Sequence, residues 1–160
     1  MLTQQQALDL FEYEKGKLFW RINVSPRARA GAEAGSPSSS GHIKIRYLHK
    51  YYLAHRIVFI MFNKNLPDCI DHINGDPSDN RIENLRAATP SQNAMNKKLN
   101  CTSRSKAKNV RWSAERSKWH VQMSIRGKHT HIGTFEDFEL AKFVAAEYRD
   151  KYHGEFANHG

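Results

Sequence analysis

The chain is poor in cysteine, has no long apolar run and is short of acidic residues. Its 160 residues include two cysteines, Cys69 and Cys101, which stand far apart and form no C-x-x-C pair. The sequence therefore predicts neither a disulfide scaffold nor a structural zinc site. No stretch approaches the roughly 20 apolar residues of a membrane-spanning helix, and the N-terminus lacks the basic-then-apolar pattern of a secretory signal. We expect a soluble, cytoplasmic protein with no membrane partner.

The shortage of acids is concentrated in one part of the chain. The whole chain has 25 Lys and Arg against 16 Asp and Glu, a formal charge of +9. Between residues 97 and 131 ten basic residues face one acid, Glu115, so this segment alone accounts for the excess. Basic residues interleaved with Trp112 and Trp119 indicate a polyanionic partner such as nucleic acid. The plainer alternative is a solvated basic surface.

Residues 69–96 are the stretch around which the chain is organised. A short apolar run ends on Asp71-His72, and Asn74-Gly75 begins a series of turn signals. Residues 84–88 read as a second strand. Thr89 as N-cap with Pro90 at the first helical position then predicts a helix. The expected order is strand, loop, strand, helix.

Within this frame Asp71, His72, Asn84 and Asn93 resemble the HNH motif of the ββα-metal nucleases. The flanking segments 54–58 and 79–86 resemble those of free-standing phage homing endonucleases. That family often has His at its last motif position, where this chain has Asn93. The resemblance implies a metal-dependent endonuclease of the phage homing type, acting on double-stranded DNA in the cytoplasm of a bacterial host.

The resemblance also assigns roles to the four residues. His72 would be the general base, because an imidazole with a pKa near 6.5 is mostly neutral at cellular pH. Asn84 would orient His72, while Asp71 and Asn93 would hold the metal ion. Two oxygen donors suit Mg²⁺, with Mn²⁺ as a substitute, and do not suit zinc. We interpret His55 as structural rather than catalytic. Asp76, Asp79, Asn80 and Arg81 are interpreted as turn and loop residues, with a supporting role at the site as the weaker alternative.

The segment before this motif predicts supporting elements. Thr3 and Gln6 form a capping box at the start of a short helix. Residues 25–41 are small, polar and rich in Gly and Pro, which predicts a long, mobile loop. The other expected elements are a strand at 18–21, a β-hairpin at 42–47 and 51–54, and a buried helix at 55–62.

The C-terminal third follows a different pattern. Residues 97–107 read as a basic linker, and three short strands are expected at 110–112, 119–125 and 130–135. A helix with acids in its first turn should then cover this sheet, through residues at helical spacing: Leu140, Ala141, Val144, Ala145, Tyr148 and Tyr152. The segments around Asn109–Trp112, Trp119, 132–135 and 139–141 resemble an AP2-type DNA-binding domain.

That second resemblance implies a sheet face that enters the major groove. The positions that match the family's DNA contacts, with neighbouring basic and aromatic residues, are Lys108, Arg111, Trp112, Gln122, Ser124, Lys128, His129 and His131. Arg111 is the best candidate to read guanine and Gln122 to read adenine. Lys108 and Lys128 are better placed for phosphates. Trp112 is equally compatible with stacking on DNA and with a place in the core.

The predicted fold class is α+β. It has an N-terminal ββα-metal nuclease domain with a β-hairpin extension at 1–96, a linker at 97–107, and an AP2-like domain of three antiparallel strands and one helix at 108–157. The rival interpretation is a DNA-binding regulator whose HNH half is a non-catalytic scaffold. A weaker one is an RNA-directed or nonspecific nuclease. The sequence leaves monomer and dimer open.

Overall fold

The computed structural model describes residues 1–99 and 103–160. Cys101, and the middle of the predicted linker at 97–107, lie outside the described residues. The chain divides into two compact units, residues 1–89 and 90–160. The division falls before helix α3 (Pro90–Met95), whereas the sequence analysis placed that helix at the end of the nuclease domain.

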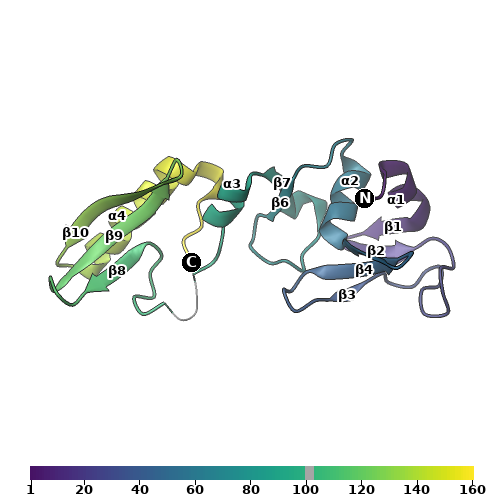
Figure 1. Ribbon diagram of the computed structural model, residues 1–160, viewed down its shortest axis with the longest axis horizontal. Coiled ribbons are helices and arrows are strands. Elements are labelled where there is room, and N and C mark those ends of the chain that lie inside the picture. The colour runs from purple at the N-terminus through teal and green to yellow at the C-terminus, as the bar shows by residue number, and fades with distance from the viewer. Residues whose placement is uncertain (100–102) are drawn as a thin grey trace. The chain divides into compact units, whose positions relative to one another are not determined.

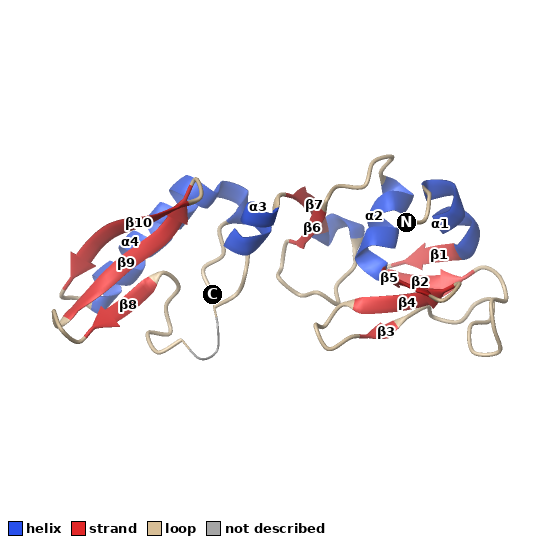
Figure 2. Cartoon of the chain, in the orientation of Figure 1, coloured by secondary structure: helices blue, strands red, loops and turns tan. Residues whose placement is uncertain are grey.

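The first unit contains small antiparallel sheets and two helices (Figures 1 and 2). The elements in chain order are α1 (Gln4–Leu10), β1 (Phe11–Glu14), β2 (Lys17–Trp20), β3 (Ser36–Pro37), β4 (Ile43–Tyr47), β5 (Lys50–Leu53), α2 (Ala54–Phe62), β6 (Cys69–His72), the 3₁₀ turn η1 (Ile82–Asn84) and β7 (Leu85–Ala88). One hairpin pairs β1 with β2, a three-stranded sheet has the order β3-β4-β5, and a second hairpin pairs β6 with β7.

Local signals in the sequence explain several of these elements. The capping box of Thr3 and Gln6 is present at the start of α1. The β4–β5 hairpin turns at Leu48 and His49, both at positive φ (46° and 62°), which keeps the turn compatible with the strand twist. Helix α2 is the central element of the core, and Val58 in it is fully buried. The predicted helix, hairpin and buried helix are confirmed.

The segment 25–41, predicted as a long mobile loop, is mostly irregular, and within it only Ser36–Pro37 form a strand, β3. Main-chain hydrogen bonds join this segment to β2, from Trp20 N to the Ala32 oxygen (3.0 Å) and from Ala34 N to the Leu18 oxygen (2.7 Å). Ala34 is buried in the core, and β3 adds a further pairing with β4. A composition of small residues lets the backbone lie close along the edge of β2, and composition alone does not reveal these bonds.

The second unit is a three-stranded antiparallel sheet with one long helix packed on it (Figures 1 and 2). The elements after α3 are β8 (Val110–Ser113), β9 (Lys118–Ile125), β10 (Lys128–Phe135), α4 (Phe138–His153) and the 3₁₀ turn η2 (Gly154–Phe156). The strand order is β10-β9-β8. The side chain of Asp137 caps α4 by accepting from Leu140 N at 2.6 Å. The three predicted strands and the helix are confirmed.

Helix α4 covers the sheet with smaller residues than the periodicity suggested. Ala141 and Ala145 are fully buried, but Leu140 is 49% exposed and Tyr152 is 39% exposed, so these two do not cover the sheet as predicted. Arg149 is buried instead and donates to the Lys108 carbonyl at 2.8 Å and to Asn109 Oδ1 at 3.2 Å. This arginine ties α4 to the start of β8, a position that a hydrophobic pattern does not reveal. In the described part of the chain, every helix is too short or too polar to cross a membrane.

Candidate active site

Asp71 and His72 are the last two residues of β6, where that strand pairs with β7. Cross-strand partners are Asp71 with Arg86 and His72 with Leu85. Successive side chains of a strand leave from opposite faces, so the carboxylate and the imidazole serve different surroundings. Both are buried, with Asp71 3% and His72 7% exposed. The strand ends because Gly75, at positive φ, turns back to donate to the His72 carbonyl at 2.8 Å.

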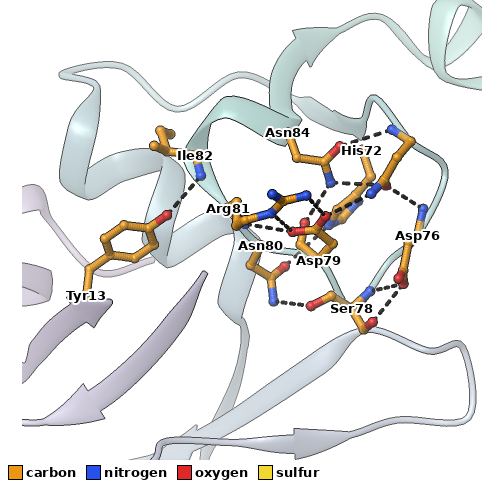
Figure 3. Close-up of polar contacts among 10 residues, drawn as sticks. Tyr13, His72, Asp76, Ser78, Asp79, Asn80, Arg81, Ile82 and Asn84 are labelled. Carbon is orange, nitrogen blue, oxygen red and sulfur yellow. Dashed lines mark hydrogen bonds and ion pairs between the residues drawn. The ribbon is translucent and has the colours of Figure 1, made fainter. Parts of the chain in front are cut away.

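The loop that follows is held by its own polar side chains (Figure 3). Asp76 Oδ1 accepts from the backbone and hydroxyl of Ser78 at 2.9 and 2.7 Å. The guanidinium of Arg81 binds both oxygens of Asp79 at 2.9 and 2.7 Å, and this contact lowers the pKa of the Asp79 carboxyl to about 2. The short Asx-type bonds replace the missing strand pairing and give the loop a defined shape.

Asn80 is the residue that holds the imidazole of His72. Its side chain is 2% exposed, and its Oδ1 lies 3.3 Å from His72 Nε2. The amide nitrogen of Asn80 donates to the Ser78 carbonyl at 3.2 Å, which fixes the amide orientation. Since Oδ1 only accepts, His72 carries its proton on Nε2, and the lone pair is on Nδ1. From the sequence, Asn80 was expected to be a turn or loop residue, with a supporting role only as the weaker alternative.

Burial keeps the His72 imidazole in its neutral form. Its pKa lies below the ordinary value, first because burial penalises the charged ring, although the hydrogen bond to Asn80 acts in the opposite direction. A neutral imidazole with a lone pair on a defined nitrogen is the form that a general base requires. The structure thus gives His72 the protonation state that its predicted role needs.

Asn84, the other predicted catalytic residue, closes the loop onto η1. Its Nδ2 donates to the Asp79 carbonyl at 2.8 Å and to Asn74 Oδ1 at 3.1 Å, and its Oδ1 accepts from Asn74 N at 3.0 Å (Figure 3). These bonds fix the loop that carries Asn80. The role of Asn84 in orienting His72 stays a prediction. In this structure Asn84 bonds to the loop that carries Asn80, and Asn80 bonds to His72.

Asp71 forms a buried ion pair with its cross-strand partner. Arg86 approaches Oδ2 with two nitrogens, Nη2 at 2.7 Å and Nε at 2.8 Å. A carboxylate is an oxygen donor of the kind that hard divalent cations accept. The other predicted metal ligand, Asn93, is half-buried in α3 of the second unit. Its role as a ligand stays a prediction.

Three histidines gather around this end of β6. The rings of His42, His55 and His72 have centroid separations of 5.2 Å (42 to 55), 5.7 Å (42 to 72) and 5.0 Å (55 to 72). Each offers one nitrogen, and the three nitrogens lie within 4.8 Å of one another. Burial, together with the neighbouring imidazoles, lowers the pKa of His55 to about 3. The sequence analysis missed this group, because positions 42, 55 and 72 follow no spacing that marks metal ligands.

The register of the second unit places five predicted DNA contacts on one face of the sheet. Gln122 pairs with His131 and Ser124 with His129, while Arg111 pairs with His120 on the same face. All of the five predicted residues are exposed, namely Arg111, Gln122, Ser124, His129 and His131. Their side chains therefore lie on the face of the sheet opposite α4.

The remaining three predicted DNA contacts lie elsewhere in the second unit. Trp112 is on the opposite face, 45% exposed, in an edge-to-face contact with Trp119 at 4.9 Å. Lys128, at the start of β10, is exposed. The ammonium of Lys108 donates to the carbonyls of Met95 (2.9 Å) and Lys97, and burial lowers its pKa to about 8. In this structure Lys108 ties the end of α3 to β8, a different role from the phosphate contact that the sequence suggested.

Comparison with known proteins adds two findings. Residues 52–95 match the family model described as HNH endonuclease. Protein 3.8 of Escherichia phage T7 is 37% identical over 90 residues, which span 55% of this chain and 72% of the phage protein. No solved structure matches the chain significantly. The family match covers β5 through α3, which includes all four residues of the predicted motif.

Proposed function

We propose that this chain hydrolyses phosphodiester bonds in duplex DNA, as a metal-dependent endonuclease of the phage homing type. The chain belongs to the family of Protein 3.8 of Escherichia phage T7 and carries an HNH endonuclease domain. The observation that carries the proposal is the setting of His72. Its imidazole is buried, neutral and held by Asn80, and the preceding residue of the same strand, Asp71, carries a carboxylate that is paired with Arg86. A histidine with a purely structural role would not require this combination of features.

In this proposal His72 activates water. Nδ1 takes a proton from the water, the water oxygen forms a bond to phosphorus, and the bond from phosphorus to the 3′ oxygen breaks, with a proton reaching the leaving oxygen from solvent. Nε2–H keeps its bond to Asn80 throughout, so the positive charge that forms on the ring faces the Asn80 carbonyl. The bond thereby stabilises the imidazolium when it appears.

Asp71 and Asn93 would hold the metal ion. Both are oxygen donors, a set that fits Mg²⁺ or Mn²⁺, since these ions keep part of their water shell and complete the rest with substrate phosphate. When bound, such an ion acts as a Lewis acid toward the phosphate and the leaving oxygen. Arg86 holds Oδ2 of Asp71 and so fixes the direction of the carboxylate.

The second unit would supply DNA binding in the manner of an AP2-like domain. Its exposed sheet face carries Arg111 and Gln122, which have the donor and acceptor patterns to read guanine and adenine. The excess of basic residues in 97–131 adds phosphate attraction. A single active site cuts one strand at a time, so a monomer would nick and a dimer would break both strands.

The test is cleavage of supercoiled plasmid and of phage T7 genomic DNA by the full chain, with Mg²⁺ and then with excess EDTA. We expect nicked or linear product with Mg²⁺ only, and at least a hundredfold slower cutting by His72→Ala, since general bases contribute about 10²–10⁴-fold. His49→Asn is the matched control, because His49 is exposed in a hairpin turn at positive φ, which Asn tolerates.

Two outcomes would contradict the proposal. Equal cutting by the wild type and His72→Ala would remove His72 from the mechanism. DNA that shifts in a gel but stays intact under every metal condition would support the regulator with a non-catalytic HNH scaffold. Circular dichroism of each variant separates a catalytic defect from a failure to fold.

A further inference from the structure

Three imidazoles from three separate elements meet beside the predicted active site. His42 precedes β4, His55 lies in the first turn of α2, and His72 ends β6. One nitrogen from each lies within 4.8 Å of the other two. Nitrogens bound to one tetrahedral zinc ion lie about 3.3 Å apart, from zinc–nitrogen bonds of about 2.0–2.1 Å. Side-chain rotations that close the largest gap by about 1.5 Å would complete such a site.

Two of the three rings are already oriented by hydrogen bonds through one nitrogen. Nδ1 of His42 lies 3.1 Å from Ser40 Oγ, and Nε2 of His72 lies 3.3 Å from Asn80 Oδ1. Metal-bound histidines have this arrangement, in which one ring nitrogen binds an oxygen while the other binds the ion. The turn that carries His42 is pressed onto the active-site loop, since a Cβ on Gly41 would lie 2.7 Å from Pro77.

The third ring, His55, argues against a purely structural cluster. It is only 5% exposed, and among the described residues its buried Nδ1 has no hydrogen-bond partner. Buried polar atoms are nearly always bonded, and an exception calls for an explanation such as an ion. Burial also holds this ring neutral, which is the form that binds metals.

We propose that His42, His55 and His72 form a binding site for a first-row transition cation, with Zn²⁺ as the principal ligand, separate from the oxygen-donor pair Asp71 and Asn93. Imidazole suits zinc, nickel and copper, whereas Mg²⁺ prefers oxygen. Occupancy would engage the imidazole of His72 and deprive the nuclease of its base. Zinc is then an inhibitor, and this second part rests on the proposed function.

The binding half is tested without any DNA. Metal-free full-length protein is titrated with Zn²⁺ by calorimetry and with Co²⁺ by visible absorption, whose intensity reports tetrahedral nitrogen ligation. We expect one ion per chain, at least tenfold weaker binding in His42→Gln, and about tenfold weaker binding in Ser40→Ala, the effect typical of outer partners. His49→Asn should bind as the wild type does.

Several results would overturn the site. Unchanged zinc affinity in His42→Gln would overturn it. If Asp71→Asn weakened zinc binding while His42→Gln did not, the ion would lie at the carboxylate instead. Because His55 is buried, His55→Gln serves as a second variant only if its melting temperature in EDTA matches that of the wild type. The half-buried His42 gives the primary result.

The inhibitory half uses cleavage with saturating Mg²⁺ and buffered free zinc. The rate of cutting by the wild type should fall as zinc fills its site and should return when a zinc chelator is added. His42→Gln should need at least tenfold more free zinc for the same fractional inhibition, with each protein compared with its own rate in Mg²⁺ alone. Zinc that binds the three histidines without slowing the cutting would refute the inhibition. If no DNA is cut under any condition, the proposed function fails, while the titrations still decide the site.

Discussion

The hydrogen bond between Asn80 and His72 makes an unusually specific prediction, because two substitutions at residue 80 should shift the pH profile of cleavage in opposite directions. Cleavage requires neutral His72, so activity is lost as pH falls through the pKa of that ring. The Asn80 carbonyl stabilises the protonated ring and raises this pKa, against the larger lowering by burial. Asn80→Ala removes the acceptor and should move the acidic limb to lower pH. Asn80→Asp replaces it with an anion and should move the limb to higher pH.

The size of the effect follows from the bond. A neutral hydrogen bond contributes about 1 kcal/mol, and the 3.3 Å separation of Nε2 and Oδ1 is at the long end of the range. Loss of this bond from the transition state should slow cleavage by Asn80→Ala about fivefold on the pH plateau, since 1.36 kcal/mol is a factor of ten. The variant should also unfold at lower urea concentration, because Asn80 is buried and its loss leaves the Ser78 carbonyl without that donor.

The assay is the initial rate of plasmid nicking from pH 5 to 9 in Mg²⁺ at constant ionic strength. Ser78→Ala is the matched control: it removes a hydroxyl bond to Asp76 in the same loop without touching the bond to His72. Its acidic limb should match that of the wild type. Acidic limbs that coincide in Asn80→Ala, Asn80→Asp and the wild type, or that move the same way in both variants, would refute the assignment of His72 as the base held by Asn80.

Three further substitutions test the ion pair and the second unit. Arg86→Met leaves the buried Asp71 carboxylate without its partner and should lower the free energy of unfolding by about 3–5 kcal/mol; unchanged urea denaturation would show that the pair contributes little. Lys108→Met should destabilise the second unit by about 2 kcal/mol, because it loses charged bonds to two carbonyls. Normal stability with a loss of DNA affinity that is largest at low salt would instead indicate a phosphate contact and contradict that role. Arg111→Ala should weaken duplex DNA binding by about 1–3 kcal/mol with normal thermal stability, measured by fluorescence anisotropy, and unchanged affinity would remove it from the interface.

The elements of this fold were largely readable from local sequence, because local physics determines them. The capping box of Thr3 and Gln6, the hairpin turn at Leu48 and His49, and the Asp137 cap all depend on residues that are close in sequence. The hydrogen bonds that join the segment 25–41 to β2 were not predicted, because composition does not encode them. Arg149 was missed for the same reason, since its bonds to Lys108 and Asn109 span 41 and 40 residues in sequence.

The residues of the candidate site likewise fall into those that the sequence indicates and those that only the three-dimensional structure brings together. Asp71 and His72 were found because they are adjacent and belong to a motif of fixed order, whereas Asn80 and His55 acquire their roles from three-dimensional proximity. Asn80 becomes the partner of His72 only because Asn84 and Asp79 fold the loop back toward β6. This dependence has a testable consequence: a substitution such as Asn84→Ala should slow cleavage by releasing Asn80, and should therefore displace the acidic limb in the same direction as Asn80→Ala. An Asn84→Ala variant that slows cleavage with an unshifted limb would mean that Asn84 acts on the reaction by a route that does not pass through Asn80.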